Sequence, residues 1–182
     1  MVLGFVVLCL GTIVLNTITN GKTNPLLFMT YRSSLREPLT YVRFFTHVLG
    51  HTSWQHFIGN ISYILLLGPL LEEKYGGSRI LRIIVITALV TGVINYVFFY
   101  NTALCGASGI CFAFILLASF TSFKDGEIPI TFILVTIIFL GQQIYDSLYV
   151  QDDISNMAHV IGGVIGAGFG FTVGKKRAAK KK

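Results

Sequence analysis

Long apolar runs dominate this chain of 182 residues and limit what it can fold into. Only 12% of its residues are charged and 53% are hydrophobic, whereas soluble domains average about 25% charged residues. A helix of about 20 apolar residues crosses the roughly 30 Å of hydrocarbon in a bilayer. We therefore predict an all-α, polytopic membrane protein with six transmembrane helices. The expected spans are residues 3–19, 54–71, 80–100, 108–120, 128–149 and 157–173.

The ends of the chain and its cysteines refine this prediction. The first run lacks a basic flank and an A-x-A cleavage site, so we expect a retained span rather than a removed signal peptide. We divide the chain into a six-helix membrane domain at residues 1–174 and a basic cytoplasmic tail at residues 175–182. Cys9, Cys105 and Cys111 lie in apolar stretches without C-x-x-C spacing, which indicates packing residues rather than a disulfide framework.

Positive charges predict the topology, because Lys and Arg concentrate in cytoplasmic loops. The loop at residues 20–53 is expected outside, and both termini are expected in the cytoplasm. At about 34 residues this loop exceeds ordinary connections, so we expect it to have structure of its own. The chain has a net charge of +6, and its basic residues are concentrated in the tail. A basic tail directly after an apolar run suits anionic lipid head groups better than nucleic acid. No nucleic-acid partner is therefore expected. Ten basic residues lie on the expected cytoplasmic side, namely Lys74, Arg79, Arg82, Lys124 and the six of the tail, against Lys22, Arg32, Arg36 and Arg43 outside.

The fourth run is anomalous because its 13 residues cover only about 20 Å as a helix. Such a helix is tolerable if other helices surround it and a water-filled cavity takes up the missing length. Ser108 begins this run within the sequence GASG and would lie at the floor of that cavity, where the first turn of a helix offers unsatisfied N–H groups. A nucleophilic serine is one interpretation. The other is helix packing, for which small residues such as Gly109 and Ala113 are typical.

His159 is the histidine that lies well inside a predicted span, where an ionisable side chain usually has a functional partner. Gly162 and Gly166 follow it at i+3 and i+7 and share its helix face. Packing of that face against Gly109 and Ala113 would bring His159 near Ser108. The alternative is a histidine that is merely hydrogen-bonded within the helix bundle.

His56 and Asn60 lie four residues apart at the start of the second run, on one helix face. Both side chains can donate hydrogen bonds to the oxyanion of an acyl-transfer reaction. The alternatives are an interfacial histidine and a helix-packing asparagine. A metal site at His47, His51 and His56 is disfavoured because no H-E-x-x-H motif is present, and we expect neither a metal nor another cofactor.

Three motifs together resemble the rhomboid intramembrane serine proteases, and the compact six-span bacterial type most closely. These motifs are RFFTHVLGHTSWQHFIGN, GASG and AHVIGGVIG, and the resemblance covers about residues 43–170. It implies a bundle around a short central fourth helix and a catalytic dyad of Ser108 as nucleophile with His159 as general base. It implies an oxyanion hole formed by the Ser108 backbone N–H, His56 and Asn60. Supporting positions are Gly106, Gly109, Phe112, Gly162 and Gly166.

The resemblance also implies partners and a location. The expected substrates are transmembrane segments of membrane proteins in a bacterial plasma membrane, with the active site opening to the outer side. Lateral substrate entry is implied past the fifth run and the loop that follows it. Gly141, Gln142 and Gln143 lie near the outer end of that run. The extra N-terminal domain of some relatives is not expected here. Phe112 stands where the family often has tyrosine, so ring stacking on the histidine can survive but a hydroxyl hydrogen bond cannot.

Two other classes compete with a protease. A proteolytically inactive rhomboid-like protein that binds or escorts transmembrane clients would share the fold, but the presence of Ser108 and His159 argues against it. A transporter or channel would be expected to show paired intramembrane charges or repeat symmetry, and the sequence has neither. The oligomeric state is left open.

Overall fold

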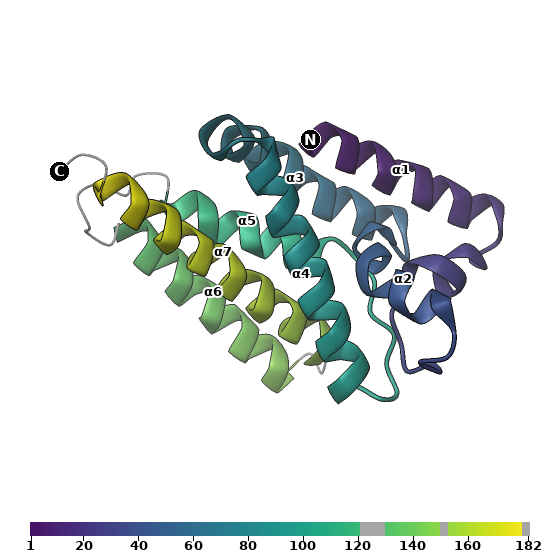
Figure 1. Ribbon diagram of the computed structural model, residues 1–182. Helices are drawn as coiled ribbons and strands as arrows, with labels where there is room; N and C mark the ends of the chain where they lie inside the picture. Colours follow the sequence, from purple (N-terminus) through teal and green to yellow (C-terminus); the bar gives the residue numbers. More distant parts are fainter. Residues whose placement is uncertain (121–129, 150–152, 180–182) are drawn as a thin grey trace.

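The computed structural model describes residues 1–120, 130–149 and 153–179, and these residues form an all-helical protein (Figure 1). The described part contains no strand, and its one isolated bridge pairs Thr30 with Leu104. The predicted all-α class is therefore confirmed. The α-helices are α1 (Val2–Ile18), α2 (Pro38–Thr46), α3 (Trp54–Tyr75), α4 (Gly77–Phe98), α5 (Ser108–Ser119), α6 (Ile130–Tyr149) and α7 (Asp153–Ala179).

Six of these helices correspond to the predicted apolar runs, and α2 lies in the long loop between the first two. That loop also contains a π-helical turn, η1 (Asn24–Phe28), and a 3-10 turn, η2 (His47–Leu49). Pro38 occupies the first position of α2, where its fixed φ suits the helix and its missing N–H costs nothing. The expectation that this loop has its own structure is confirmed.

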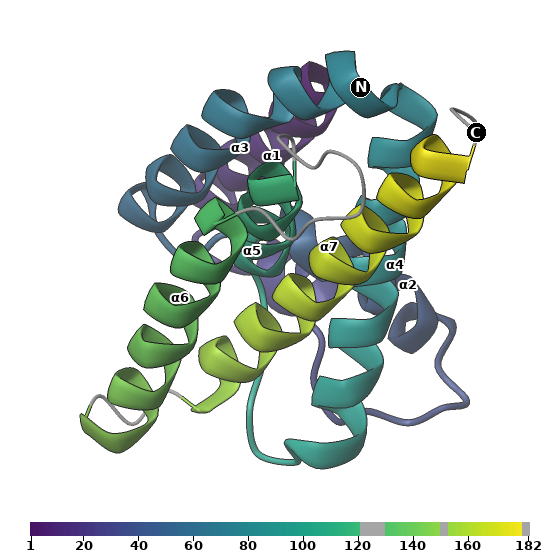
Figure 2. The same cartoon turned by 90° about the vertical axis from the view of Figure 1, so that its left-hand side faces the viewer.

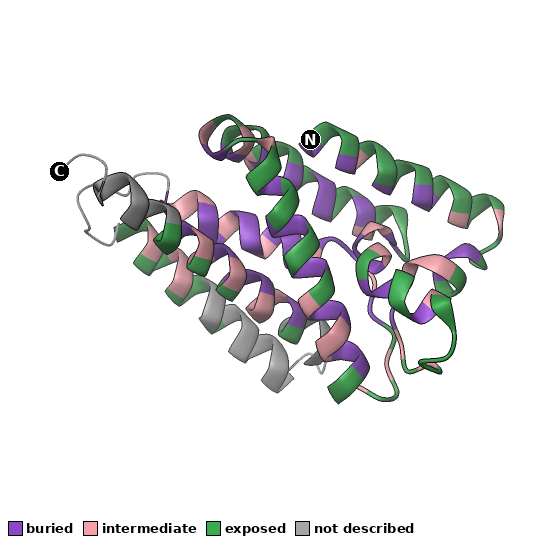
Figure 3. Cartoon of the chain, in the orientation of Figure 1, coloured by how far each residue is buried: buried purple, intermediate pink, exposed green. Residues whose placement is uncertain are grey.

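The short helix α5 lies at the centre of the protein (Figures 1 and 3). It has 12 residues, about 18 Å of helix, and packs against α3, α4, α6 and α7. Its most extensive contacts are with α7. Most of its residues are buried, including Ile110, Phe114 and Leu117, which are fully enclosed. Neighbouring helices therefore surround the helix that is too short to span a bilayer alone.

Glycines allow α7 to approach α5 at the distance of backbone contact. A Cβ atom on Gly162 would lie 2.7 Å from the carbonyl carbon of Gly109, and one on Gly166 would lie 2.8 Å from that of Ala113. Side chains at these positions would overlap the backbone of α5. The face predicted from the i, i+3, i+7 spacing is thus the face that packs against α5.

The outer surface of the described helices is rich in exposed apolar side chains, as expected where lipid replaces water. Leu3, Ile18, Leu66, Phe98 and Ile138 are each more than 60% exposed. Of the helices in the described ranges, α4 is the one whose length and composition suffice to cross a membrane. The predicted count of six spans is therefore not established by helix length and composition.

Some of the sequence-based predictions concern residues outside the described part of the chain. Lys124 and residues 180–182 lie outside the described part of the chain, as do the side chains of Gln142 and Gln143. Helix α7 continues to Ala179, beyond the predicted end of the last run at residue 173.

Substitution of glycine by alanine in α7 tests the contact with α5. Gly166→Ala should lower the thermal stability in detergent, because overpacking against backbone typically costs about 1–3 kcal/mol. Gly168→Ala is the matched control, since a Cβ at Gly168 meets no atom within 4 Å. Alanine also has the higher helix propensity, so the control should melt at the same temperature or slightly higher. Equal melting temperatures for the two variants would contradict the proposed packing.

Candidate active site

A cavity of about 550 Å³ is lined by residues of α3, α5, α6 and α7. Figure 2 shows the arrangement of these four helices, with α6 toward the viewer. It brings together residues that are as many as 104 positions apart in the sequence, from Gln55 to His159. Its lining is mostly apolar, with a few polar groups. The lining residues are Gln55, His56, Gly59, Asn60, Tyr63, Ser108, Cys111, Phe112, Ile115, Val135, Ile138 and His159.

Helical spacing explains how the lining is assembled. On α3 the residues at positions 56, 59, 60 and 63 recur at i, i+3, i+4 and i+7, and therefore share one face. On α5 positions 108, 111, 112 and 115 repeat the same pattern. The predicted site residues Ser108, His159, His56, Asn60 and Phe112 all line this cavity. The predicted supporting residues Gly109, Gly162 and Gly166 do not line it, but hold α5 against α7.

Ser108 is the first residue of α5, and Ala107 is its N-cap without a side-chain cap. The carbonyl of Ala107 accepts hydrogen bonds from the N–H groups of Ile110 at 2.9 Å and Cys111 at 3.0 Å. Because Ser108 lines the cavity, the N-terminal end of α5, with the positive end of its helix dipole, lies at the cavity. This arrangement favours negative charge that develops near Ser108.

Gly106 precedes the serine in a conformation that only glycine adopts easily. Its φ is +131°, and a Cβ there would lie 2.8 Å from both Cε1 and Nε2 of His56. The same Cβ would lie 3.6 Å from Nδ2 of Asn60. The bare backbone of Gly106 thus leaves space in front of the two side chains that were predicted to be hydrogen-bond donors.

Asn60 presents an unsatisfied donor at the cavity. Its side chain is only 8% exposed, and within the described part of the chain Nδ2 has no hydrogen-bond partner. The thiol of Cys111 donates to the backbone carbonyl of Asn60 at 3.3 Å and lies 3.8 Å from Oδ1. A buried donor without a partner costs about 1–3 kcal/mol, so such groups usually have a function or a ligand. The oxygen atoms of Asn60 are thus in contact with the thiol of Cys111, whereas Nδ2 is a donor without a partner among the described residues.

Phe112 packs its ring on His159. The ring centroids are 4.2 Å apart and the planes are inclined by 40°. Residue 112 therefore buttresses the histidine with a phenyl ring, as expected from its position four residues after the serine.

Polar groups from α4 and the long loop fix the segment that leads to Ser108. Thr30 and Leu104 exchange backbone hydrogen bonds of 3.0 and 2.9 Å, and the N–H of Gly106 donates to the carbonyl of His47 at 2.9 Å. The imidazole of His47 contacts Oγ1 of Thr91 at 3.1 Å. The amide of Asn95 donates to the carbonyl of Thr30 at 3.1 Å.

This polar support and several of the cavity residues were not predicted from the sequence. Thr87, Thr91 and Asn95 are buried at i, i+4 and i+8 on α4, a polar stripe within an apolar run that signals an inward face. Tyr63, Cys111 and Ile115 could have been found by extending the predicted site by three or four residues along each helix. Val135 and Ile138 come from α6 and have no such signal. Within the described ranges, no three His, Cys, Asp or Glu side chains are grouped to hold a metal ion.

The family model of the Rhomboid domain matches residues 38–176. This chain belongs to the rhomboid family. It is therefore a multi-pass integral membrane protein, which agrees with the apolar exterior of its helices.

Individual relatives are distant in sequence. Rhomboid protease GlpG of Haemophilus influenzae is 25% identical over 139 residues, which cover 74% of this chain and 71% of that protein. Rhomboid-related protein 2 of Mus musculus is 28% identical over 160 residues, with 76% and 53% covered. Rhomboid-related protein 1 of Caenorhabditis elegans is 29% identical over 140 residues, with 72% and 39% covered. This chain thus spans about half or less of the two rhomboid-related proteins.

Two histidines of the long loop are held in their neutral form. Burial lowers the pKa of His47 to about 4 from 6.5, and hydrogen bonding to the backbone of residues 43 and 44 offsets this only in part. Burial, and secondly the charge of His56, also lowers the pKa of His51 to about 4. An unfolded chain takes up these protons below about pH 6.5, whereas the folded protein does not until about pH 4. Folding stability therefore falls as the pH falls from 6.5 to 4.

Replacement of one of these histidines should flatten the pH dependence of stability. His47 alone accounts for about 3 kcal/mol between pH 7 and pH 4, since one pKa unit corresponds to 1.36 kcal/mol. His47→Gln keeps a hydrogen-bonding side chain but cannot titrate. The difference between melting temperatures at pH 7 and pH 4.5 should be smaller in this variant than in the unmodified protein. The same difference in both proteins would refute the neutral, buried state of His47.

Proposed function

We propose that this protein is an intramembrane serine endopeptidase that cleaves transmembrane segments of membrane proteins. The observation that carries the proposal is the shared cavity, which is lined by a serine at a helix N-terminus, a histidine from α7 and a buried, unpartnered amide donor. Membership of the rhomboid family supports it, as does the similarity to proteins named rhomboid proteases.

The proposed chemistry uses Ser108 and His159 as a dyad. His159 takes the proton of the Ser108 hydroxyl while Oγ attacks the carbonyl carbon of the scissile peptide bond. The C–N bond then breaks, and the leaving amine receives the proton from His159. Water hydrolyses the resulting acyl-enzyme with His159 again as the base. The ring of Phe112 orients the histidine in place of a carboxylate.

The oxyanion that forms in each step would be stabilised by three donors. These are the backbone N–H of Ser108, Nδ2 of Asn60 and the imidazole of His56. The support for Asn60 is its buried nitrogen, which a substrate oxygen would satisfy. The support for His56 is its position against Gly106, where only a glycine leaves room for the oxygen.

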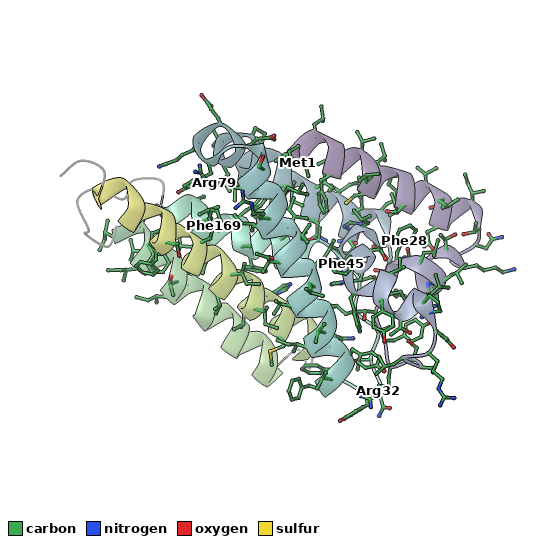
Figure 4. The ribbon with its side chains drawn as sticks, viewed as in Figure 1. Met1, Phe28, Arg32, Phe45, Arg79 and Phe169 are labelled. Carbon is green, nitrogen blue, oxygen red and sulfur yellow. The ribbon has the colours of Figure 1, made fainter. Side chains whose placement is uncertain are left out.

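The membrane arrangement that fits this chemistry has six spans, formed by every α-helix except α2. The proposed domain consists of residues 1–174 with a basic tail after it. Arg79 and Met1 lie at one end of the bundle and Arg32 at the opposite end (Figure 4). With the more basic end in the cytoplasm, both chain termini are cytoplasmic and the site opens to the outer side. A bacterial plasma membrane is the proposed location, and the expected partners are transmembrane substrates and the surrounding lipid.

The dyad is tested by cleavage of a model transmembrane substrate in detergent. Ser108→Ala and His159→Ala should each abolish cleavage, and the double variant should be no worse because the two groups act as a unit. Ser119→Ala is the matched control, since this serine lies on the same helix, outside the cavity lining, and its hydroxyl donates to the carbonyl of Leu116 at 2.6 Å. It should keep full activity. A folded protein that leaves every substrate intact would favour the inactive, client-binding alternative.

The oxyanion hole is tested by measuring how much cleavage activity remains when one donor is removed. Asn60→Ala should retain measurable cleavage, reduced by about 10²–10³ in turnover, because it removes one donor from a shared site. The rate should fall through kcat, since the interaction forms only in the transition state. If Asn60→Ala is as inactive as Ser108→Ala at an unchanged melting temperature, the proposed division of roles is wrong.

A further inference from the structure

Thr52 contacts the imidazole of His56 just before α3 begins. Its Oγ1 lies 3.2 Å from Nδ1 of His56, four residues later in the chain. The opposite edge of the ring faces Gly106, because a Cβ at Gly106 would lie 2.8 Å from Nε2. The two nitrogens of His56 are thus separated, with Nδ1 at the threonine hydroxyl and Nε2 at the cavity.

A neutral imidazole carries a single N–H, so the group at one nitrogen decides the state of the other. If Thr52 donates its hydroxyl proton to Nδ1, then Nε2 must carry the hydrogen and can donate into the cavity. If Nδ1 instead donates to Thr52, then Nε2 presents a lone pair, which would repel an oxyanion. The hydroxyl of Thr52 therefore bears on whether His56 can act as a donor at all.

The other neighbours of His56 do not perform this task. Ser53 accepts from the backbone N–H of His56 at 3.1 Å and serves as the N-cap of α3, so its effect is on the helix rather than on the ring. The ring of His51 packs edge-on against that of His56, with centroids 5.1 Å apart. This contact fixes the plane of the ring but does not choose between its nitrogens.

We propose that Thr52 is a positioning residue that holds His56 in the Nε2–H tautomer, with the N–H directed toward the cavity. The inference rests on the proposed function, because it assigns the state in which His56 serves the oxyanion hole. Thr52 itself touches neither substrate nor Ser108. Its contribution passes entirely through the imidazole, and the hydroxyl group rather than the size of the side chain is what matters.

The experiment measures the tautomer directly and activity beside it. Protein labelled with ¹³C and ¹⁵N at its histidines is examined in detergent micelles at pH 8 by NMR, with His56 assigned from the spectrum of His56→Gln. The unmodified protein and Thr52→Ser should show His56 as the Nε2–H tautomer, because both keep a hydroxyl. Thr52→Val has nearly the same shape without the hydroxyl, and should show a mixture of tautomers. Its kcat should fall about three- to tenfold at an unchanged KM, the effect expected from one exposed hydrogen bond.

Two controls separate this role from a structural one. Ser53→Ala should lower the melting temperature through the lost cap but leave the His56 tautomer unchanged. Thr172→Val should change neither, since that threonine is exposed, lies far along α7 from His56 in sequence and donates to the carbonyl of Gly168 in its own helix at 2.7 Å. An Nδ1–H tautomer in the unmodified protein, or in Thr52→Ser, would overturn the inference even if Thr52→Val does not fold. An unchanged tautomer in Thr52→Val would also overturn it. Failure of the proposed function would look different, namely absence of cleavage by the unmodified protein whatever the tautomer.

Discussion

The backbone contact between α5 and α7 is the constraint on which the candidate site depends. Gly162 and Gly166 have no side chains to separate the two helices, so α7 reaches the carbonyl groups of Gly109 and Ala113. This contact lies one turn from His159 on α7 and begins one residue after Ser108 on α5. Larger residues would move the histidine away from the serine by the thickness of a side chain. The close packing of α7 against α5 therefore has two effects. It helps to enclose the short helix α5, and it places His159 at the cavity that Ser108 also lines.

The remaining parts of the site are fixed from the opposite side, by polar groups that replace water within the bundle. Carbonyl groups of Thr30 and His47 receive hydrogen bonds from Asn95 and Gly106, which ties the long loop to α4 and to the segment before Ser108. Several buried polar atoms in the described part of the chain have no hydrogen-bond partner, among them Oγ1 of Thr30, Oδ1 of Asn95 and Nδ2 of Asn60. Among the residues that carry these atoms, Asn60 is the one that lines the cavity, which is why we propose that its amide nitrogen binds a substrate oxygen.

Much of this arrangement could be predicted from the sequence, because helix periodicity translates directly into shared faces. The spacing of His159, Gly162 and Gly166 predicted the face of α7, and the shortness of the run after GASG predicted a surrounded helix. The spacing of His56 and Asn60 predicted one side of the cavity. Contacts between distant segments could not be predicted in this way. The approach of Val135 and Ile138 to the cavity, and that of Cys111 to Asn60, depends on how helices tilt and pack, which no local pattern records. The count of membrane spans likewise does not follow from helix length alone, since α4 alone among the described helices is both long and apolar enough.

We propose that Ser108 attacks a carbonyl whose oxygen is held by Asn60 and the first turn of α5. An experimental structure of the protein after reaction with a fluorophosphonate, a probe that bonds to activated serines, tests this most directly. The phosphorus should be bonded to Oγ of Ser108, with its phosphoryl oxygen within hydrogen-bond distance of Nδ2 of Asn60 and the N–H of Ser108. A probe bonded to another residue, or a phosphoryl oxygen directed away from Asn60 with its nitrogen still unpartnered, would contradict the account.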